Sequence, residues 1–336
     1  MMTLSRRQIV LGATALLPPS CAPQTERPIR AAMTMQADAN KSGVYVWLQA
    51  FEKIISHNIG RSLHVFPSSA LGGEAERTEL VRRGLLEINS TGTDLLTPLS
   101  GWLEVFNWPF AFSSYGHIDA FIHRTGFLNL VNADLEPHGF WLADIAFIGG
   151  MVGVHNTKHP ITSLDDMRRL RMRAMNASQI ELYSSWGVRS AQVAWEEVPQ
   201  ALETGIVDGY LNSALIPILF GQTRQIRHFT DLRLSPSYRV IIMSTQAKEM
   251  LLNQGALFEV ALAVARKKNR AWANNLISDE RAQLEAVGIT VTDITREKRD
   301  KIRNASIAMV ENTVPTDQFK RILEMSAAAE QIMETL

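Results

Sequence analysis

Apolar residues recur along the chain at spacings that predict alternating strands and helices. A short apolar run at residues 29–35 predicts a buried strand. From Val44 to Ile55 the apolar positions fall three and four apart, which predicts a helix with one apolar face. Asn40 or Ser42 can cap the start of this helix.

The same alternation continues after this helix. A second apolar run at 63–66 precedes a helix that we expect to begin after Gly73 and to end at Gly84. A short buried strand around Ile88 follows. Strands and helices that alternate at this spacing favour a parallel α/β sheet.

A second unit of the same kind begins near residue 150. The pattern predicts strands at 170–174 and 207–211, with helices at 177–186 and 196–203 between them. A chain of 336 residues is long enough for two such units, so we expect two lobes.

Residues 256–286 contain neither proline nor glycine and follow one continuous helical pattern. Such a helix would be about 45 Å long, which exceeds a small domain, so we expect it to lie across both lobes. Two further helices, at 296–312 and 316–335, complete the pattern.

The first residues have the features of an export signal. Arg6 and Arg7 precede an apolar run at 9–17 that is too short to span a bilayer. The paired arginines resemble a twin-arginine signal, with an ordinary signal peptide as the alternative. Cys21 follows, where a bacterial lipoprotein would be cleaved, although two prolines depart from that pattern. We therefore expect residues 1–28 to be an export signal and the protein to be periplasmic, with lipid attachment at Cys21 left open.

Composition excludes several classes of function. Thirty-four Lys and Arg residues balance thirty-four Asp and Glu residues, so the chain has no basic field with which to attract nucleic acid. The single cysteine excludes an internal disulfide framework. The sequence contains no glycine-rich phosphate loop, no zinc-protease motif and no Gly-x-Ser-x-Gly nucleophile motif. We predict neither an enzyme nor a cofactor.

The histidines do not predict a metal site. His155 and His159 are four residues apart on a segment expected to be a strand, which would separate their rings by about 13 Å. His117, His123 and His138 stand in polar contexts, where a solvated side chain is the ordinary expectation.

Arg173 is the strongest candidate for ligand contact. It lies at the carboxyl end of a predicted strand, where open α/β sheets bind their ligands, and a guanidinium can hold a carboxylate by two parallel hydrogen bonds. A surface arginine is the alternative. Trp195 offers a flat apolar wall or core filling, and Asn212 offers an amide at the end of the next strand.

Two segments, residues 170–176 and 195–212, resemble the solute-binding proteins of TRAP (tripartite ATP-independent periplasmic) transporters. Segments 66–74, 107–112 and 288–291 are similar to the same family, so the resemblance covers nearly everything after residue 30. It implies a periplasmic-binding-protein-like fold of class α/β, with two lobes and a long helix spanning both. Within it we predict lobe I at 29–150 plus 238–277, and lobe II at 151–237 plus 278–336.

The resemblance also implies a site. Arg173 matches the arginine that pairs with the substrate carboxylate, and Asn176, Trp195 and Asn212 match neighbouring contact positions. Two first-lobe positions, Gln36 and Glu74, match residues that reach the rest of the solute.

The match has two departures. No arginine stands at 151–154, where many relatives have a second one, and Gly92 stands where some relatives have a carboxylate. The first lobe therefore has few expected charged contacts, which argues against a dicarboxylate or a sialic-acid-like ligand.

The function implied is capture of a small organic acid in an interlobe cleft and its delivery to the membrane permease subunits of an ion-gradient-driven TRAP transporter. One alternative is a ligand-binding component that reports to a signalling receptor. Another is an isomerase or lyase on the same scaffold, with Glu74 or Asp94 as base.

Overall fold

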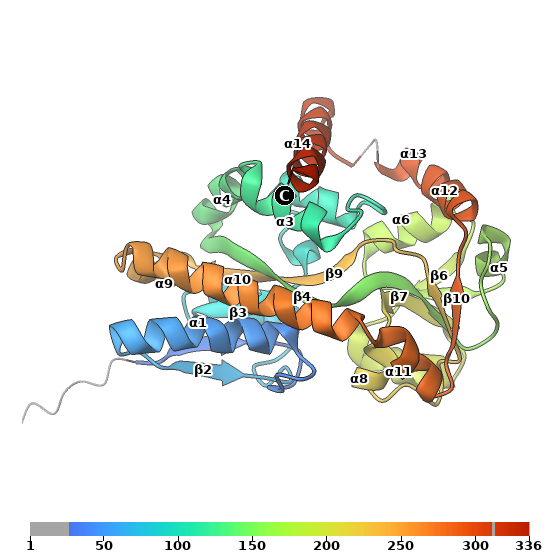
Figure 1. Ribbon diagram of the computed structural model, residues 1–336, viewed down its shortest axis with the longest axis horizontal. Helices are drawn as coiled ribbons and strands as arrows, with labels where there is room; N and C mark the ends of the chain where they lie inside the picture. The colour runs from blue at the N-terminus through green and yellow to red at the C-terminus, as the bar shows by residue number, and fades with distance from the viewer. Residues whose placement is uncertain (1–26, 311–312, 336) are drawn as a thin grey trace, which may run out of the picture.

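The computed structural model describes residues 27–310 and 313–335, and it has two lobes joined by long strands (Figure 1). The predicted export signal and Cys21 lie outside the described residues. No helix in the described part of the chain combines the length and the apolar character needed to cross a membrane.

The first lobe is built on three short parallel strands: β1 (Ile29–Ala32), β2 (Leu63–Phe66) and β3 (Ile88–Thr91). Its helices are α1 (Gly43–Ile59), α2 (Glu74–Arg82), α3 (Tyr115–Arg124) and α4 (Phe127–Leu135), with 3-10 turns η1 (Thr93–Leu95), η2 (Gly101–Asn107) and η3 (Glu136–His138). The sequence predicted the first two helices and all three strands, and Ser42 caps α1 by accepting a hydrogen bond from the Tyr45 N–H.

The second lobe contains strands β5 (Arg171–Ala174), β6 (Arg189–Gln192), β7 (Gly209–Ser213), β8 (His228–Asp231) and β10 (Thr290–Asp293). β5 is parallel to both β6 and β7, and β8 is parallel to β10. The helices of this half are α5 (Leu164–Arg168), α6 (Ala177–Ser185), η4 (Trp195–Glu197), α7 (Val198–Glu203), α8 (Ile216–Leu219), α11 (Glu280–Ala286), α12 (Arg296–Ala305) and α13 (Ile307–Val310).

Two long strands cross between the lobes, and both run antiparallel to their neighbours. β4 (Phe140–Asn156) pairs with β9 (Pro236–Ser244) at one end and with β7 and β8 at the other. β9 also pairs with β3 of the first lobe. The expectation of a parallel sheet is therefore wrong at these two strands. The hydrophobic pattern of a strand does not indicate whether it runs parallel or antiparallel to its neighbours.

The crossing is marked by a register shift in β4 between Phe147 and Met151. A Cβ atom on Gly149 would lie 2.4 Å from the Ser213 hydroxyl oxygen, and one on Gly150 would lie 2.3 Å from a Glu280 carboxylate oxygen. A side chain at either position would have to displace Ser213 or Glu280, so the two glycines permit the close approach of these residues at the irregular stretch of β4.

The long helix is shorter than the sequence predicted. α10 (Ala256–Ile277) spans 22 residues, and a break at Ser278 and Asp279 separates it from α11. The Ser278 hydroxyl donates to the Asn275 carbonyl oxygen, which competes with continuation of the helix. α10 nevertheless contacts both lobes, because Leu262 packs in a core of the first lobe and Leu276 packs against a core of the second.

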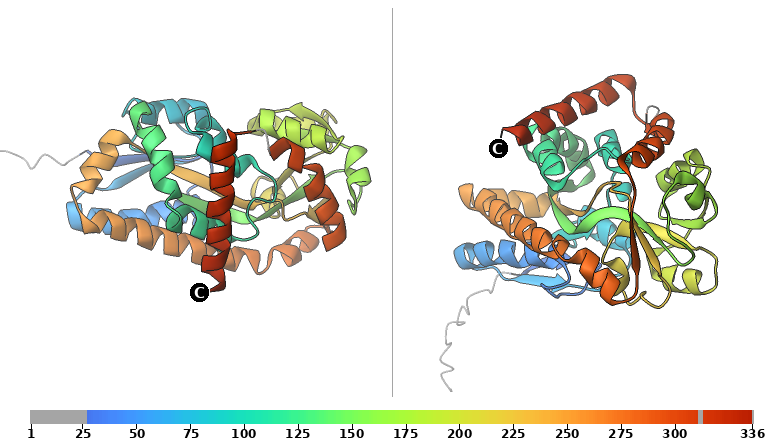
Figure 2. Two further views of the ribbon diagram at one scale, coloured as in Figure 1. Left: turned by 90° about the horizontal axis from the view of Figure 1, so that it is seen from above. Right: turned by 45° about the vertical axis from the view of Figure 1, so that its right-hand side comes forward.

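The C-terminal helix α14 (Thr316–Glu334) returns to the first lobe, where it crosses α3 (Figure 2). Its residues Ile322 and Met325 share a core with Ile118 and Phe121 of α3. The predicted division of the chain between the lobes stays a prediction, and it places α14 with the second lobe.

Asp144, on β4, is fully buried and connects several elements of the first lobe. Trp47 Nε1 donates to its Oδ2 at 2.9 Å, and Arg266 Nε donates to its Oδ1 at 3.2 Å. His123 Nε2 lies 3.1 Å from the same Oδ1. Burial alone would raise the pKa of Asp144, but the contact with His123 and the charges of Arg270 and Arg266 hold that pKa well below its usual range.

Two of the histidines expected to be solvated are enclosed. The His123 side chain is 12% exposed beside Asp144, and His117 is buried with Nε2 3.2 Å from the Ser326 carbonyl oxygen. The burial of these two histidines could not be predicted from their polar neighbours in sequence, because the elements that enclose them, α14 and β4, come later in the chain. His138 is exposed, as expected.

Replacing Asp144 should strongly destabilise the first lobe. We expect Asp144→Ala to lower the free energy of unfolding by about 3–5 kcal/mol, because the guanidiniums of Arg266 and Arg270 lose the buried carboxylate beside them. Urea denaturation measures the change. Glu324, which forms an exposed ion pair with Arg321, provides the control. Glu324→Ala should lower the free energy of unfolding by less than about 1 kcal/mol. Similar losses for the two variants would contradict the role given to Asp144.

Glu280 should make stability depend on pH. Burial, followed by repulsion from Asp231, raises its pKa from 4.5 to about 7. Ionisation then costs free energy in the folded state alone, so the stability of the native protein falls as the pH rises from about 4.5 to about 7. Glu280→Gln cannot ionise, and it should gain up to about 3 kcal/mol relative to the native protein over that interval.

Guanidinium unfolding at pH 5 and pH 8 checks this expectation. Glu285→Gln, at an exposed position of the same helix, is the control. A difference between Glu280→Gln and the native protein that is the same at both pH values would show that Glu280 does not titrate in this range.

Candidate functional site

Arg173 lies near the carboxyl end of β5 and is 7% exposed. Its Nε donates to the Val193 carbonyl oxygen at 2.9 Å, which fixes the plane of the guanidinium. Its Cζ lies 5.7 Å from the centre of the Trp195 ring, within the range of a cation–π contact. Arg173 makes no ion pair with any side chain in the described ranges, so a buried cation stands here without a counter-ion.

The pKa of Arg173 is lowered from its ordinary value because the guanidinium is buried without a counter-ion. Burial lowers the pKa of the guanidinium, and the positive charge of Arg239 acts in the same direction. The carboxylates of Glu196 and Asp94 act in the opposite direction without closing an ion pair. A carboxylate that entered from outside would supply the missing negative charge.

The aromatic side of the site is rigid. Trp195 begins η4 and is half-buried, and it meets Tyr210 and Phe220 edge to face at 5.7 and 5.1 Å between ring centres. Tyr210 lies on β7 in register with Arg173 on β5. The ring is therefore held beside the guanidinium by side chains from two other elements.

The two amides stand at the ends of neighbouring elements. Asn212 lies on β7, two residues beyond Tyr210, and its Oδ1 accepts from the Ser213 N–H at 2.9 Å. Asn176 follows β5 and caps α6, because its Oδ1 accepts from the Gln179 N–H at 3.0 Å. Both residues are half-buried, and in each the bonded oxygen leaves the amide N–H groups as donors.

In the first lobe, Glu74 is engaged by residues from three segments. Arg239 of β9 donates from Nη1 to one Glu74 oxygen at 3.1 Å, and its Nη2 lies 2.6 Å from the other. The Thr34 hydroxyl and the Gly92 N–H also donate to this carboxylate, at 3.1 and 3.3 Å. Although burial acts to raise the pKa of Glu74, the charges of Arg239 and Arg77 prevail and lower it, so the group is held ionised.

Arg239 and Arg77 are charged residues that the sequence reasoning did not find. The sequence led us to expect few charged contacts in the first lobe. Arg77 is nevertheless a charged residue of this lobe, completely buried, and it donates to Asn89 and Thr34. An arginine inside the apolar run of β9 was the available signal for Arg239. Gln36, by contrast, is exposed in the loop after β1, and no side-chain hydrogen bond among the described residues joins it to Glu74.

The structure thus brings Arg173 and Trp195 together, places Asn176 and Asn212 at the ends of adjoining elements, and leaves Gln36 apart. Within the described ranges no group of three or more His, Cys, Asp or Glu side chains is arranged to hold a metal ion. His155 is buried, with Nε2 2.9 Å from the Ser213 carbonyl oxygen.

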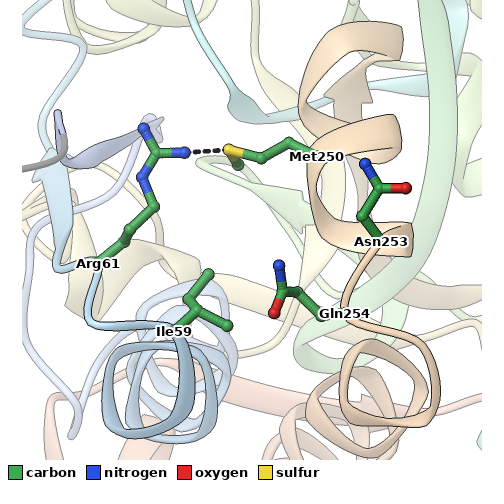
Figure 3. A pocket seen from close by; sticks show the side chains of 5 residues that line it. All are labelled: Ile59, Arg61, Met250, Asn253 and Gln254. Carbon is green, nitrogen blue, oxygen red and sulfur yellow. Dashed lines mark hydrogen bonds between the residues drawn. The ribbon is translucent and has the colours of Figure 1, made fainter.

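Two cavities lie away from these residues. One, of about 320 Å³, opens between the end of α1 and the helix α9 (Thr245–Leu252), where Arg61 turns toward Met250 (Figure 3). The other, of about 420 Å³, lies between α3, α14 and α12. Neither is lined by Arg173. We place the candidate site at Arg173 because its guanidinium is buried without a counter-ion.

Two lobes joined by crossing strands, with a buried and unpaired cation at a strand end, define a protein of the solute-binding class. The sequence matches the family model "Bacterial extracellular solute-binding protein, family 7" over residues 32–316. The chain belongs to this family, and the resemblance to solute-binding proteins of TRAP transporters is confirmed.

Individual relatives agree with this assignment. A solute-binding protein of Verminephrobacter eiseniae is 27% identical over 303 residues, which cover 88% of this chain and 86% of the relative. The periplasmic ectoine-binding protein of a TRAP transporter of Halomonas elongata superposes with a TM-score of 0.82, 20% identity and coverage of 91% and 100% of the two chains. A TRAP solute-binding protein of a Polaromonas species, bound to D-erythronate, has a TM-score of 0.77, 23% identity and coverage of 90% and 99%.

The capping role of Asn176 can be separated from any contact with ligand. Asn176→Ala should lower the free energy of unfolding by about 1 kcal/mol through loss of the α6 cap, whereas Asn176→Asp keeps an N-cap acceptor and should stay near the native value. Urea denaturation of both variants is the measurement. Equal stability of Asn176→Ala and the native protein would show that the cap contributes nothing.

Proposed function

We propose that this protein captures a small organic acid outside the cytoplasm and delivers it to the permease of a TRAP-type transporter. The observation that carries the proposal is Arg173, a buried guanidinium without a counter-ion at a strand end. Membership of the solute-binding family and the two-lobed fold support it. The relative from Polaromonas holds D-erythronate, which is a carboxylate.

The proposed ligand carboxylate binds the Nη groups of Arg173, since Nε is already engaged by Val193. Trp195 forms an apolar wall for the body of the ligand, at about 25 cal/mol per Å² of apolar surface removed from water. The N–H groups of Asn176 and Asn212 donate to further ligand oxygens. Glu74 and Gln36, in the first lobe, are the proposed contacts to the far side of the ligand.

Closure of the lobes follows from this arrangement. A ligand held by Arg173 on one lobe and by groups of the other stabilises the closed form, because it contacts both lobes only there. Exclusion of water strengthens the ion pair by lowering the local dielectric. The irregular stretch of β4 at Gly149 and Gly150 is the proposed hinge, and the closed form is the one presented to the permease.

The proposed location is the periplasm, reached through a twin-arginine-like signal in residues 1–28, with Cys21 as the site of a lipid anchor if one is attached. Uptake would draw its energy from an ion gradient across the permease. The boundaries proposed for the lobes are those given by the sequence, 29–150 plus 238–277 and 151–237 plus 278–336, although α14, within the last range, packs against α3 of the first lobe.

Two other functions use the same site. A sensor would pass the closed form to a signalling receptor in place of a permease. An enzyme would need a base near Arg173. The lowered pKa of Glu74 makes that carboxylate a weak base, whereas burial raises the pKa of Asp94, the other candidate. Incubation of the purified protein with keto, sugar and aromatic acids separates binding from catalysis. Acid recovered unchanged, with a raised melting temperature, supports binding, and a converted product contradicts it.

Arg173→Ala should weaken carboxylate binding by about 2–5 kcal/mol, because the ligand charge would then be buried without a partner. Isothermal titration calorimetry with an acid found in the thermal-shift screen measures the loss. Arg171→Ala, at an exposed position of the same strand, is the matched control and should bind normally. Equal affinity of the two variants would refute the assignment.

A further inference from the structure

Asp94 lies in η1, directly after β3, and its half-buried carboxylate has no ion-pair partner in the described part of the chain. It stands beside the Glu74–Arg239 pair. A Cβ atom on Gly92 would lie 2.2 Å from Asp94 Oδ1 and 3.3 Å from Arg239 Nη1. A side chain at Gly92 would therefore collide with this carboxylate, which occupies the space that glycine leaves.

The arginines of the first lobe cannot receive a ligand carboxylate without breaking existing bonds. Arg239 already engages both oxygens of Glu74. Arg77 is completely buried, and its three nitrogens donate to Asn89, Gly72 and Thr34. Arg173 differs from both, because among the described residues it has no ion-pair partner and only its Nε donates to a protein acceptor.

Arg239 is paired with Glu74, whereas the carboxylates of Glu196 and Asp94 act on Arg173 without closing an ion pair. A single ligand carboxylate supplies the partner that Arg173 lacks. A second carboxylate would lie among the first-lobe residues, where the unpaired charge of Asp94 repels it and no unpaired cation of the described residues named above is free to receive it.

Charged groups of both lobes act on the pKa of Asp94. Burial raises its pKa, and the charge of Glu74 acts in the same direction. The charges of Arg239 and of Arg173, on the second lobe, act to lower it.

We propose that Asp94 selects the ligand by its far end: it accepts a hydrogen bond from a hydroxyl or ammonium group of a solute whose single carboxylate is held by Arg173, and it repels a second carboxylate. This inference rests on the proposed function, because it takes Arg173 as the carboxylate site. It names the substrate class as monocarboxylates with a terminal hydrogen-bond donor.

The test compares acids that differ only in the far end. Aldonates of four to six carbons carry a terminal hydroxyl, the aldarates of equal length carry a second carboxylate, and ω-amino acids paired with diacids of similar length supply the ammonium arm. Calorimetry on the native protein should show at least tenfold tighter binding of a donor-ended acid than of its matched diacid. The two donor-ended series show whether a hydroxyl or an ammonium is preferred.

Variants then test whether Asp94 causes the preference for donor-ended acids over diacids. Asp94→Asn should reduce the preference by tenfold or more, mainly because diacids bind more tightly. Asp165→Asn makes the same change of charge at a 75% exposed side chain of the second lobe and should leave the preference unchanged. The comparison of acids on the native protein does not depend on whether Asp94→Asn folds.

The outcomes distinguish this inference from the proposed function. Diacids that bind as tightly as their donor-ended partners, with binding still lost in Arg173→Ala, would overturn the role of Asp94 and leave carboxylate capture standing. A preference that persists in Asp94→Asn would also overturn it. Failure of every acid to bind would overturn the proposed function and this inference with it.

Discussion

The proposed binding site depends on one constraint: the guanidinium of Arg173 is buried without a counter-ion among the described residues. Arg173 is enclosed by the strand it stands on, by Val193 and by the face of Trp195, yet no carboxylate within the described ranges neutralises it. Keeping such a charge out of water costs free energy that the rest of the fold must offset. A ligand carboxylate would recover that cost on binding, which is the physical reason for proposing an acid as the ligand.

The remainder of the molecule holds this cation in place and provides the connection between the lobes. β4 and β9 cross between the lobes as two antiparallel strands, and the irregular stretch of β4 at Gly149 and Gly150 is the proposed hinge. On the first lobe, Glu74 and Arg239 neutralise each other, so that lobe can approach Arg173 without bringing a second free cation. In the proposed mechanism, Arg173 of the second lobe supplies most of the affinity, and Asp94 of the first lobe discriminates between ligands.

Much of this was readable from the sequence, because the informative signals are local. The spacing of apolar residues predicted α1, and the pattern at 170–174 predicted the short strand on which Arg173 lies. Cap and turn residues such as Ser42 and Gly84 set the ends of elements correctly. The family resemblance rested on segments around the same strand ends, and it extended the prediction to the two-lobed fold.

What the sequence did not predict depends on contacts between distant segments. The role of Arg239 was not predicted because its partner Glu74 lies 165 residues away. The antiparallel direction of β9 was not predicted either, because the sequence of an apolar strand does not reveal which neighbours it pairs with. His117 was expected in solvent because α14, which covers it, is far along the chain. The break after Ile277 arises from local competition by the Ser278 hydroxyl, which a composition without proline or glycine does not reveal.

The most direct test of the central claim is a crystal structure of the protein with an acid identified by calorimetry. The account predicts a closed cleft in which two oxygens of the ligand carboxylate lie about 2.7–2.9 Å from the Nη atoms of Arg173, beside the Trp195 ring. A ligand seated elsewhere, or an Arg173 side chain turned to bulk water in that structure, would contradict it.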